Sequence, residues 1–224
     1  LTLLIPTTSK RNLLIDLAAK NCKNTPLKLN TCDGSYATAA ATLFDDYVCL
    51  KSKKDIDSSA QHVIDCDIMS NGCHGGRIKN ALTFLQQFGT PSEACYSFKS
   101  KLHEFNCQKY CDDGKSQKIL TKLNSVKQIV GQSQFEAALI NKSTIGIDYQ
   151  LYDDLFEFDF GGQAVYIHKG KAIGILSGVI VGDGISQGIE YWLVRGFQGD
   201  GFADEGYMRI AKGTLGIKEG WIIQ

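Results

Sequence analysis

Hydrophobic and polar positions follow different patterns in the two halves of the chain. Ser35–Leu50 is rich in alanine and apolar residues and has neither glycine nor proline, which predicts a buried helix after the turn at residues 32–34. Further helices are predicted over Ser59–Cys66, with Ser58 or Ser59 as cap, and over Arg77–Phe88, ended by Gly89 and Pro91. The first half is therefore expected to be mostly helical.

From about residue 144, short β-type runs alternate with glycine-bearing turns. These runs predict strands at Thr144–Tyr149, Ala164–His168, Ala172–Val181, Glu190–Arg195 and Gly206–Ala211. One amphipathic helix, Gln134–Ile140, is predicted before them, and the polar segment near Asp112–Lys118 is the expected boundary between the two parts. The pattern predicts a two-lobed α+β fold, with a cleft between the lobes as the usual place for a binding site.

Composition narrows the function classes. The chain has 224 residues, enough for one large domain or two ordinary ones, and its 24 basic residues balance 24 acidic ones. Zero net charge argues against a nucleic-acid binder or a polybasic membrane-surface protein. The sequence has no uncharged apolar run long enough to span a bilayer and no low-complexity tract, so we expect neither nucleic acid nor a membrane as partner.

The eight cysteines all lie between Cys22 and Cys111. They form no paired CxxC set of the zinc-ribbon kind, so we interpret them as disulfides of a secreted, extracellular protein, with pairings that spacing alone leaves open. Because Leu1 is not a start methionine and no signal-peptide pattern is present, we expect a processed mature chain. The first half is thus expected to be cross-linked and the second half not.

Four segments resemble motifs of papain-like cysteine proteases. Residues 32–37 (CDGSYA) resemble the C-G-[SA]-C-[WY] signature, and residues 72–76 (GCHGG) resemble the GCxGG loop. Residues 64–67 (IDCD) resemble the LDC segment that precedes that loop. Residues 191–199 (YWLVRGFQG), followed by 204–207 (DEGY), resemble the stretch built on NSWG and GxxGY. The likeness covers almost the whole chain.

The resemblance implies a papain-like fold, with a helical left lobe over residues 21–122 and a β-barrel right lobe made of residues 1–20 and 123–224. Within the family, the YWLVR run, the GCHGG loop and the segment from Asp154 to Gly162 are most similar to the group 1 mite allergens. The chain looks like one of the inactivated cysteine protease paralogues of the scabies mite.

The family's chemistry needs a thiolate at a helix N-terminus, a histidine to share its proton, an asparagine to orient that histidine and a glutamine that helps to bind the oxyanion. The resemblance places these four positions, in the order nucleophile, base, orienting residue and oxyanion donor, at Ser35, Leu176, Gly196 and Leu29. Ser177 takes the base position if the register slips by one. The tryptophan that covers the orienting asparagine falls on Gln198. Ser35 itself is expected to cap the buried helix.

Three of the four replacements carry no polar side chain. Because loss of the nucleophile or base alone lowers turnover on the order of 10⁶-fold in a serine protease, the sequence predicts a pseudoenzyme and no catalytic residue. The expected function is protein binding by an inactive homologue, as a decoy or modulator at a host interface, with a host protein or peptide as partner and no cofactor. The alternatives are a weak Ser35-based hydrolase with an unrecognised base, and a nutrient or structural protein.

The resemblance also implies cleft residues and disulfides. The expected cleft is lined by Gly75, Gly76, Arg77, Ile78 and Gln198, and the implied pairs are Cys32–Cys73 and Cys66–Cys107. For the remaining cysteines, Cys22–Cys111 with Cys49–Cys95 is one option among those left open.

The remaining candidates are a sequon and the histidines. Asn141-Lys142-Ser143 is an N-glycosylation sequon. His74 lies in the GCHGG loop, whereas His62, His103 and His168 are single histidines without convergent partners, so no metal site is expected.

Overall fold

The structure is a computed structural model that describes residues 13–17, 29, 31–99, 107–120 and 122–224. Its helices are α1 (Ser35–Ser52), α2 (Ala60–Cys66), α3 (Ile78–Gln87) and α4 (Gln132–Ile140). Its strands are β1 (Leu13–Asp16), β2 (Val126–Val130), β3 (Ile145–Tyr152), β4 (Ala172–Ser186), β5 (Ile189–Arg195), β6 (Tyr207–Ala211) and β7 (Glu219–Ile223). Single 3₁₀ turns occur at Gly72–His74, Asp153–Leu155 and Gly161–Gln163.

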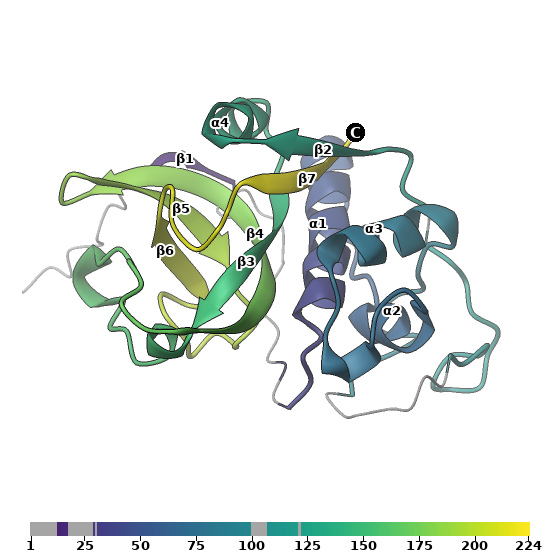
Figure 1. The fold of residues 1–224 in the computed structure, drawn as a ribbon. Helices are drawn as coiled ribbons and strands as arrows, with labels where there is room; N and C mark the ends of the chain where they lie inside the picture. Colours follow the sequence, from purple (N-terminus) through teal and green to yellow (C-terminus); the bar gives the residue numbers. More distant parts are fainter. Residues whose placement is uncertain (1–12, 18–28, 30, 100–106, 121) are drawn as a thin grey trace, which may run out of the picture.

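The strands form one antiparallel sheet in the order β2-β7-β3-β4-β5-β6, with β1 paired to β4. Figure 1 shows this sheet strongly curled, with α1 between it and the helices α2 and α3. Helices gathered to one side of an antiparallel sheet define the α+β class. The predicted fold class is therefore confirmed.

The curled sheet separates two hydrophobic cores. Neighbouring residues on β5 alternate between them: Tyr191 and Leu193 pack with α1 and α3, whereas Trp192 and Val194 pack inside the curl of the sheet. This alternation follows from the two-residue period of a strand. Helix α1 belongs to the first core, because most of its residues are buried between α2, α3 and the sheet.

Local sequence explains the helix starts. The Oγ of Ser59 accepts a hydrogen bond from the backbone N–H of His62, so this serine caps α2 as the sequence predicted. The predicted helices differ from the observed ones by one or two residues at their ends.

The boundary between the lobes at residue 122 stays a prediction.

One predicted strand is wrong, and three were missed. Ala164–His168 contains only a single bridge, between Tyr166 and Ile210, because the chain leaves the 3₁₀ turn at Gly161–Gln163 in an irregular path. The strands β1, β2 and β7 are short and pair with segments distant in sequence. The sequences of these three strands show little of the local pattern that predicts a strand.

Candidate functional site

Ser35 is the first residue of α1 and is buried. The prediction that it caps the helix is wrong, since no side chain caps α1 and Gly34 occupies the N-cap position. The Oγ of Ser35 instead accepts a hydrogen bond from the backbone N–H of Ser177 at 3.1 Å. The helix N-terminus therefore faces strand β4 at this point.

Strand β4 supplies the residues opposite Ser35. Leu176, in the position of the base, is half-buried, and the neighbouring Ser177 is buried. The Oγ of Ser177 donates a hydrogen bond of 2.5 Å to Asp148 on β3. Neither a leucine nor a serine side chain is a base near neutral pH, so neither of the two registers provides an imidazole.

Leu29 and Gly196 both lie close to the segment that contains Phe197 and Gln198. The N–H of Leu29 donates to the carbonyl of Phe197 at 3.2 Å, and its side chain is buried in the first core. The Oε1 of Gln198 lies 2.5 Å from the place where a Cβ on Gly196 would stand and accepts a hydrogen bond from the N–H of Phe197. Gln198 thus fills the space that a side chain at position 196 would need.

A groove of about 590 Å³ lies next to this centre. One wall is polar and comes from the segment between α2 and α3 and from α3 itself, whereas the other is apolar and comes from β3 and β4. The polar wall consists mostly of polar residues and glycines, with one apolar residue, Met69: Asp33, Ser70, Asn71, His74, Gly75, Gly76, Arg77 and Asn80 make up the rest. The apolar wall consists of Leu151, Ile173, Gly174, Ile175 and Leu176.

Three of the five predicted cleft residues line this groove: Gly75, Gly76 and Arg77. Ile78 does not, because its side chain is fully buried, and its Cδ1 lies 2.5 Å from the place where a Cβ on Gly146 would stand. Gln198 does not line it either, since its side chain is turned toward Gly196. A cleft role for Ile78 and Gln198 stays a prediction, because neither residue is part of this groove.

Asp148 is the functional candidate that the motifs missed. Its Oδ1 accepts hydrogen bonds from Ser177 and from the N–H of Ile78 at 3.2 Å, and its Oδ2 lies 3.8 Å from the Nη1 of Arg77. Burial raises the pKa of this carboxyl above its ordinary value, and the contacts with Ser177, Ile78 and Arg77 oppose that rise. An acidic residue in the apolar run TIGIDY was the available signal.

The disulfides Cys32–Cys73 and Cys66–Cys107 that the resemblance implied are present, each with a sequence separation of 41. Cys95 pairs with Cys111, so the open option that paired these two cysteines with others is wrong. Cys22, which that option included, lies outside the described residues.

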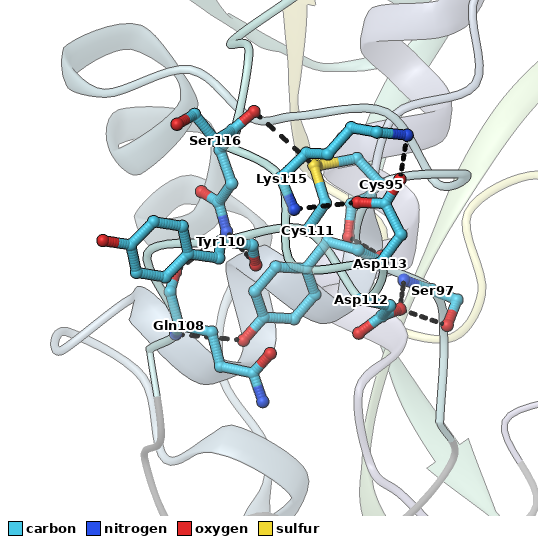
Figure 2. The surroundings of a disulfide bond; sticks show 12 residues. Cys95, Ser97, Gln108, Tyr110, Cys111, Asp112, Asp113, Lys115 and Ser116 are labelled. Atoms are coloured by element: carbon cyan, nitrogen blue, oxygen red, sulfur yellow. Dashed lines mark hydrogen bonds and ion pairs between the residues drawn. A yellow bond between two sulfur atoms is a disulfide. The ribbon is translucent and has the colours of Figure 1, made fainter.

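Figure 2 shows the polar surroundings of the Cys95–Cys111 bond, in which Ser97 donates two hydrogen bonds to Asp112 and Lys115 pairs with Asp113. Neither Cys95 nor Cys111 lines the groove. We therefore assign it no role in the groove.

The described histidines lie on different segments of the chain. His62 is buried beside Phe84 and Tyr96, and burial lowers its pKa to about 4. Its ring lies near the sulfurs of Cys66 and Cys107, but these are joined in a disulfide and cannot act as thiolate ligands. His168 stacks on Tyr152 with ring centroids 3.7 Å apart, and His103 lies outside the described residues.

Asn141 is exposed directly after α4, and its Nδ2 donates to the carbonyl of Ala137. None of the helices among the described residues combines the length and apolar character that crossing a bilayer requires.

The fold is two-lobed and of the α+β class, and its groove lies where the N-terminus of a buried helix meets a strand. These features are those of a papain-like protein. Residues 13–223 match the family described as papain family cysteine protease, so the chain belongs to the papain family of cysteine proteases. Disulfides and this family are typical of secretory-pathway proteins.

Relatives in the family are distant. The chain is 27% identical over 189 residues to cathepsin B-like CP2 of Giardia intestinalis, covering 81% of this chain and 62% of that one. It is 28% identical over 207 residues to bovine cathepsin S (Bos taurus; 89% and 60%). With Peptidase 1 of the mite Euroglyphus maynei it shares 27% over 193 residues (82% and 56%). It thus spans less than two thirds of each of these relatives, and identity does not single out the mite protein.

Solved structures support the fold. Procathepsin B S9 from Trypanosoma congolense superposes with a TM-score of 0.83 at 22% identity, covering 96% of this chain and 78% of that one. The ragweed pollen allergen Amb a 11, a cysteine protease in its proform, gives 0.77 at 20% identity, covering 97% and 67%. The papain-like fold is therefore shown.

Proposed function

We propose that this chain is a catalytically inactive member of the papain family that binds a protein or peptide in the groove between its helices and its sheet. The observation that supports the loss of catalysis is the contact between Ser35 and Ser177. At the place where the chemistry needs a nucleophile beside a base, a serine hydroxyl receives a backbone N–H, and the adjacent side chain is that of Leu176.

A Ser35-based hydrolase needs a group that accepts the serine proton. Of the described histidines only His74 lines the groove, and among the described residues no hydrogen bond joins it to Ser35. Leu29 and Gly196 offer no side-chain donor to an oxyanion or an imidazole. These replacements favour a binding role over hydrolysis.

The groove retains features that suit an extended peptide. Gly75 and Gly76 line one wall without side chains, so the main chain of a peptide could approach their backbone. On the other wall, Ile173 and Ile175 are 59% and 43% exposed, which leaves apolar surface for a ligand side chain. A protein that binds no specific partner would not need both of these groove walls.

The experiment combines turnover with binding. Wild type is assayed for hydrolysis of a fluorogenic dipeptide substrate, with a thiol-protease inhibitor as control, and is then used to select from a displayed library of random dodecapeptides. We expect no inhibitor-sensitive turnover, and we expect selected peptides whose binding is lost in Ile173→Glu/Ile175→Glu. Ile185→Glu, an exposed position at the far end of the same strand, is the matched control and should bind normally.

Turnover by wild type would contradict the proposed inactivity. Equal binding by the groove variant and the control would contradict the proposed groove.

We also propose that the protein is secreted, that Asn141 is glycosylated, and that the chain is an inactive paralogue close to the mite enzymes, with a host protein or peptide as partner. The GCHGG loop and the YWLVR run support the likeness to the mite enzymes. Enzymatic deglycosylation of secreted protein should lower its mass, and Asn141→Gln should abolish that change.

A further inference from the structure

Asp148 lies on β3, where three elements meet. It accepts hydrogen bonds from the first amide of α3, at Ile78, and from the hydroxyl of Ser177 on β4. The guanidinium of Arg77, the N-cap residue of α3, is the third partner at 3.8 Å. A carboxylate at a helix N-terminus is stabilised by the helix dipole and by charge-assisted hydrogen bonds.

These contacts join the two walls of the groove. Arg77 belongs to the polar wall, whereas Ser177 directly follows Leu176 of the apolar wall. The N–H of Ser177 in turn holds the Oγ of Ser35 at the start of α1. A continuous path of hydrogen bonds therefore runs from α3 through β3 and β4 to α1, at the level of the former catalytic centre.

We propose that Asp148 is a positioning residue, which ties the two walls of the groove together and holds Arg77 at the groove edge. The side chain of Arg77 is 54% exposed, so it remains within reach of a ligand while Asp148 restrains it. The proposal rests on the proposed use of the groove for binding, but its test needs no ligand.

A pH dependence follows from this arrangement. The charged groups that face Asp148 are Arg77 and, on β7, Glu219, which opposes ionisation. Burial and Glu219 raise the pKa of Asp148, whereas its contacts with Ser177, Ile78 and Arg77 lower it, and burial prevails. As the pH falls through the pKa, the carboxyl becomes neutral, Arg77 loses its partner, and the groove gains an uncompensated cation.

The test is an NMR titration of ¹⁵N-labelled protein. The amide of Ile78 reports the ionisation of Asp148 directly, because it donates to that carboxylate. We expect its resonance to shift with a midpoint above the ordinary aspartate value of about 3.9. The Nε–H of Arg77 should be restrained above this midpoint and mobile below it, as measured by the heteronuclear NOE.

Asp148→Asn is the principal variant. Its Oδ1 can still accept hydrogen bonds from both Ile78 and Ser177, so the fold should persist while the charge is lost. We expect a flat Ile78 titration and an Arg77 side chain that is mobile at every pH. Ser177→Ala and Arg77→Gln each remove a group that favours the carboxylate, so each should raise the midpoint.

Asp113→Asn, on the exposed 107–120 segment, is the control and should leave the titration unchanged. An Ile78 amide that does not titrate in wild type, or an Arg77 side chain equally mobile in wild type and Asp148→Asn at neutral pH, would overturn the proposal. Either result would leave peptide selection by the groove unaffected, so the two proposals can fail separately.

Discussion

The backbone N–H of Ser177 donates a 3.1 Å hydrogen bond to the Oγ of Ser35, across 142 positions of the sequence. The first residue of α1 is thereby fixed to β4 by a contact that involves no titrating group. A thiol at position 35 would meet the same amide, which can stabilise a thiolate but cannot take its proton.

Ser35→Cys alone should therefore not create a peptidase. The helix N-terminus would give the new thiol some thiolate character, but Leu176 could neither take a proton nor protonate a leaving amine. We expect turnover of a fluorogenic dipeptide to stay at background, on the order of 10⁶-fold below an intact triad enzyme. Inhibitor-sensitive turnover by this single variant would show that another residue acts as base.

The smallest set that can restore activity is Ser35→Cys with Leu176→His, and Leu29→Gln with Gly196→Asn should add to it because the losses are coupled. The new asparagine will displace the side chain of Gln198, which now occupies its space. Activity should therefore rise further when Gln198 is replaced by tryptophan as well. The comparison is the activity of the quadruple variant that keeps Gln198.

The buried ion pair between Arg195 and Asp46 should be the costliest polar contact to break. The Nη1 of Arg195 lies 3.2 and 3.1 Å from the two carboxylate oxygens, and both side chains are almost fully buried. Asp46→Ala leaves a buried cation without this partner and should lower the free energy of unfolding by about 3 to 5 kcal/mol. Urea denaturation measures the change.

Removing both charges, in Asp46→Leu/Arg195→Met, should cost much less than the sum of the single changes. Lys115→Ala, which breaks an exposed pair with Asp113, is the control and should have little effect. A small effect of Asp46→Ala would mean that water reaches Arg195.

The Cys95–Cys111 bond closes a short loop, with a sequence separation of 16. Cys95→Ser/Cys111→Ser should lower the free energy of unfolding by about 3 kcal/mol, through the greater entropy of the unfolded chain. Removing Cys32–Cys73 in the same way, with its separation of 41, should cost more, about 4 kcal/mol. Equal midpoints in urea for wild type and the first variant would contradict this prediction.

Stability should fall as the pH rises from about 6.5 to 8. Burial raises the pKa of Asp45 to about 8 and that of Glu93 to about 7, so the folded state binds more protons than the unfolded state in this range. The buried His62, with its lowered pKa, acts in the opposite direction only below about pH 6.5.

Asp45→Asn should reduce this pH dependence, since its amide oxygen can keep the hydrogen bond from the N–H of Ser58. Urea midpoints measured between pH 6 and 9 test it, with the exposed Asp113→Asn as control. A wild-type stability that rises over this range would show that these carboxyls are ionised at lower pH than their burial implies.

The sequence predicted the elements whose signal is local. The alanine-rich composition of α1 and the serine before α2 are local features, and both helices lie where they were expected. The base position at Leu176 was assigned by counting from a motif, and the structure brings the neighbouring Ser177 against Ser35. Motif spacing thus predicted which segments meet.

The sequence could not predict how distant segments share space. Ile78 was expected in the cleft, but the missing side chain of Gly146 leaves room that Ile78 fills from another part of the chain. The pairing of β2 with β7 brings together the beginning and the end of the second half of the chain. Neither strand has a strong hydrophobic pattern of its own. Asp148 was missed because its importance depends on partners from α3 and β4.

The first residue of α1 and the rest of the helix have different roles. The side chain at its first residue decides which reaction is available, whereas the side chains that follow hold the molecule together through the first core. An exchange at position 35 therefore leaves the apolar surface buried by the rest of the helix untouched. The residue at the groove end of a papain-like helix can thus change the chemistry of the site, while the packed length of the helix keeps the fold unchanged.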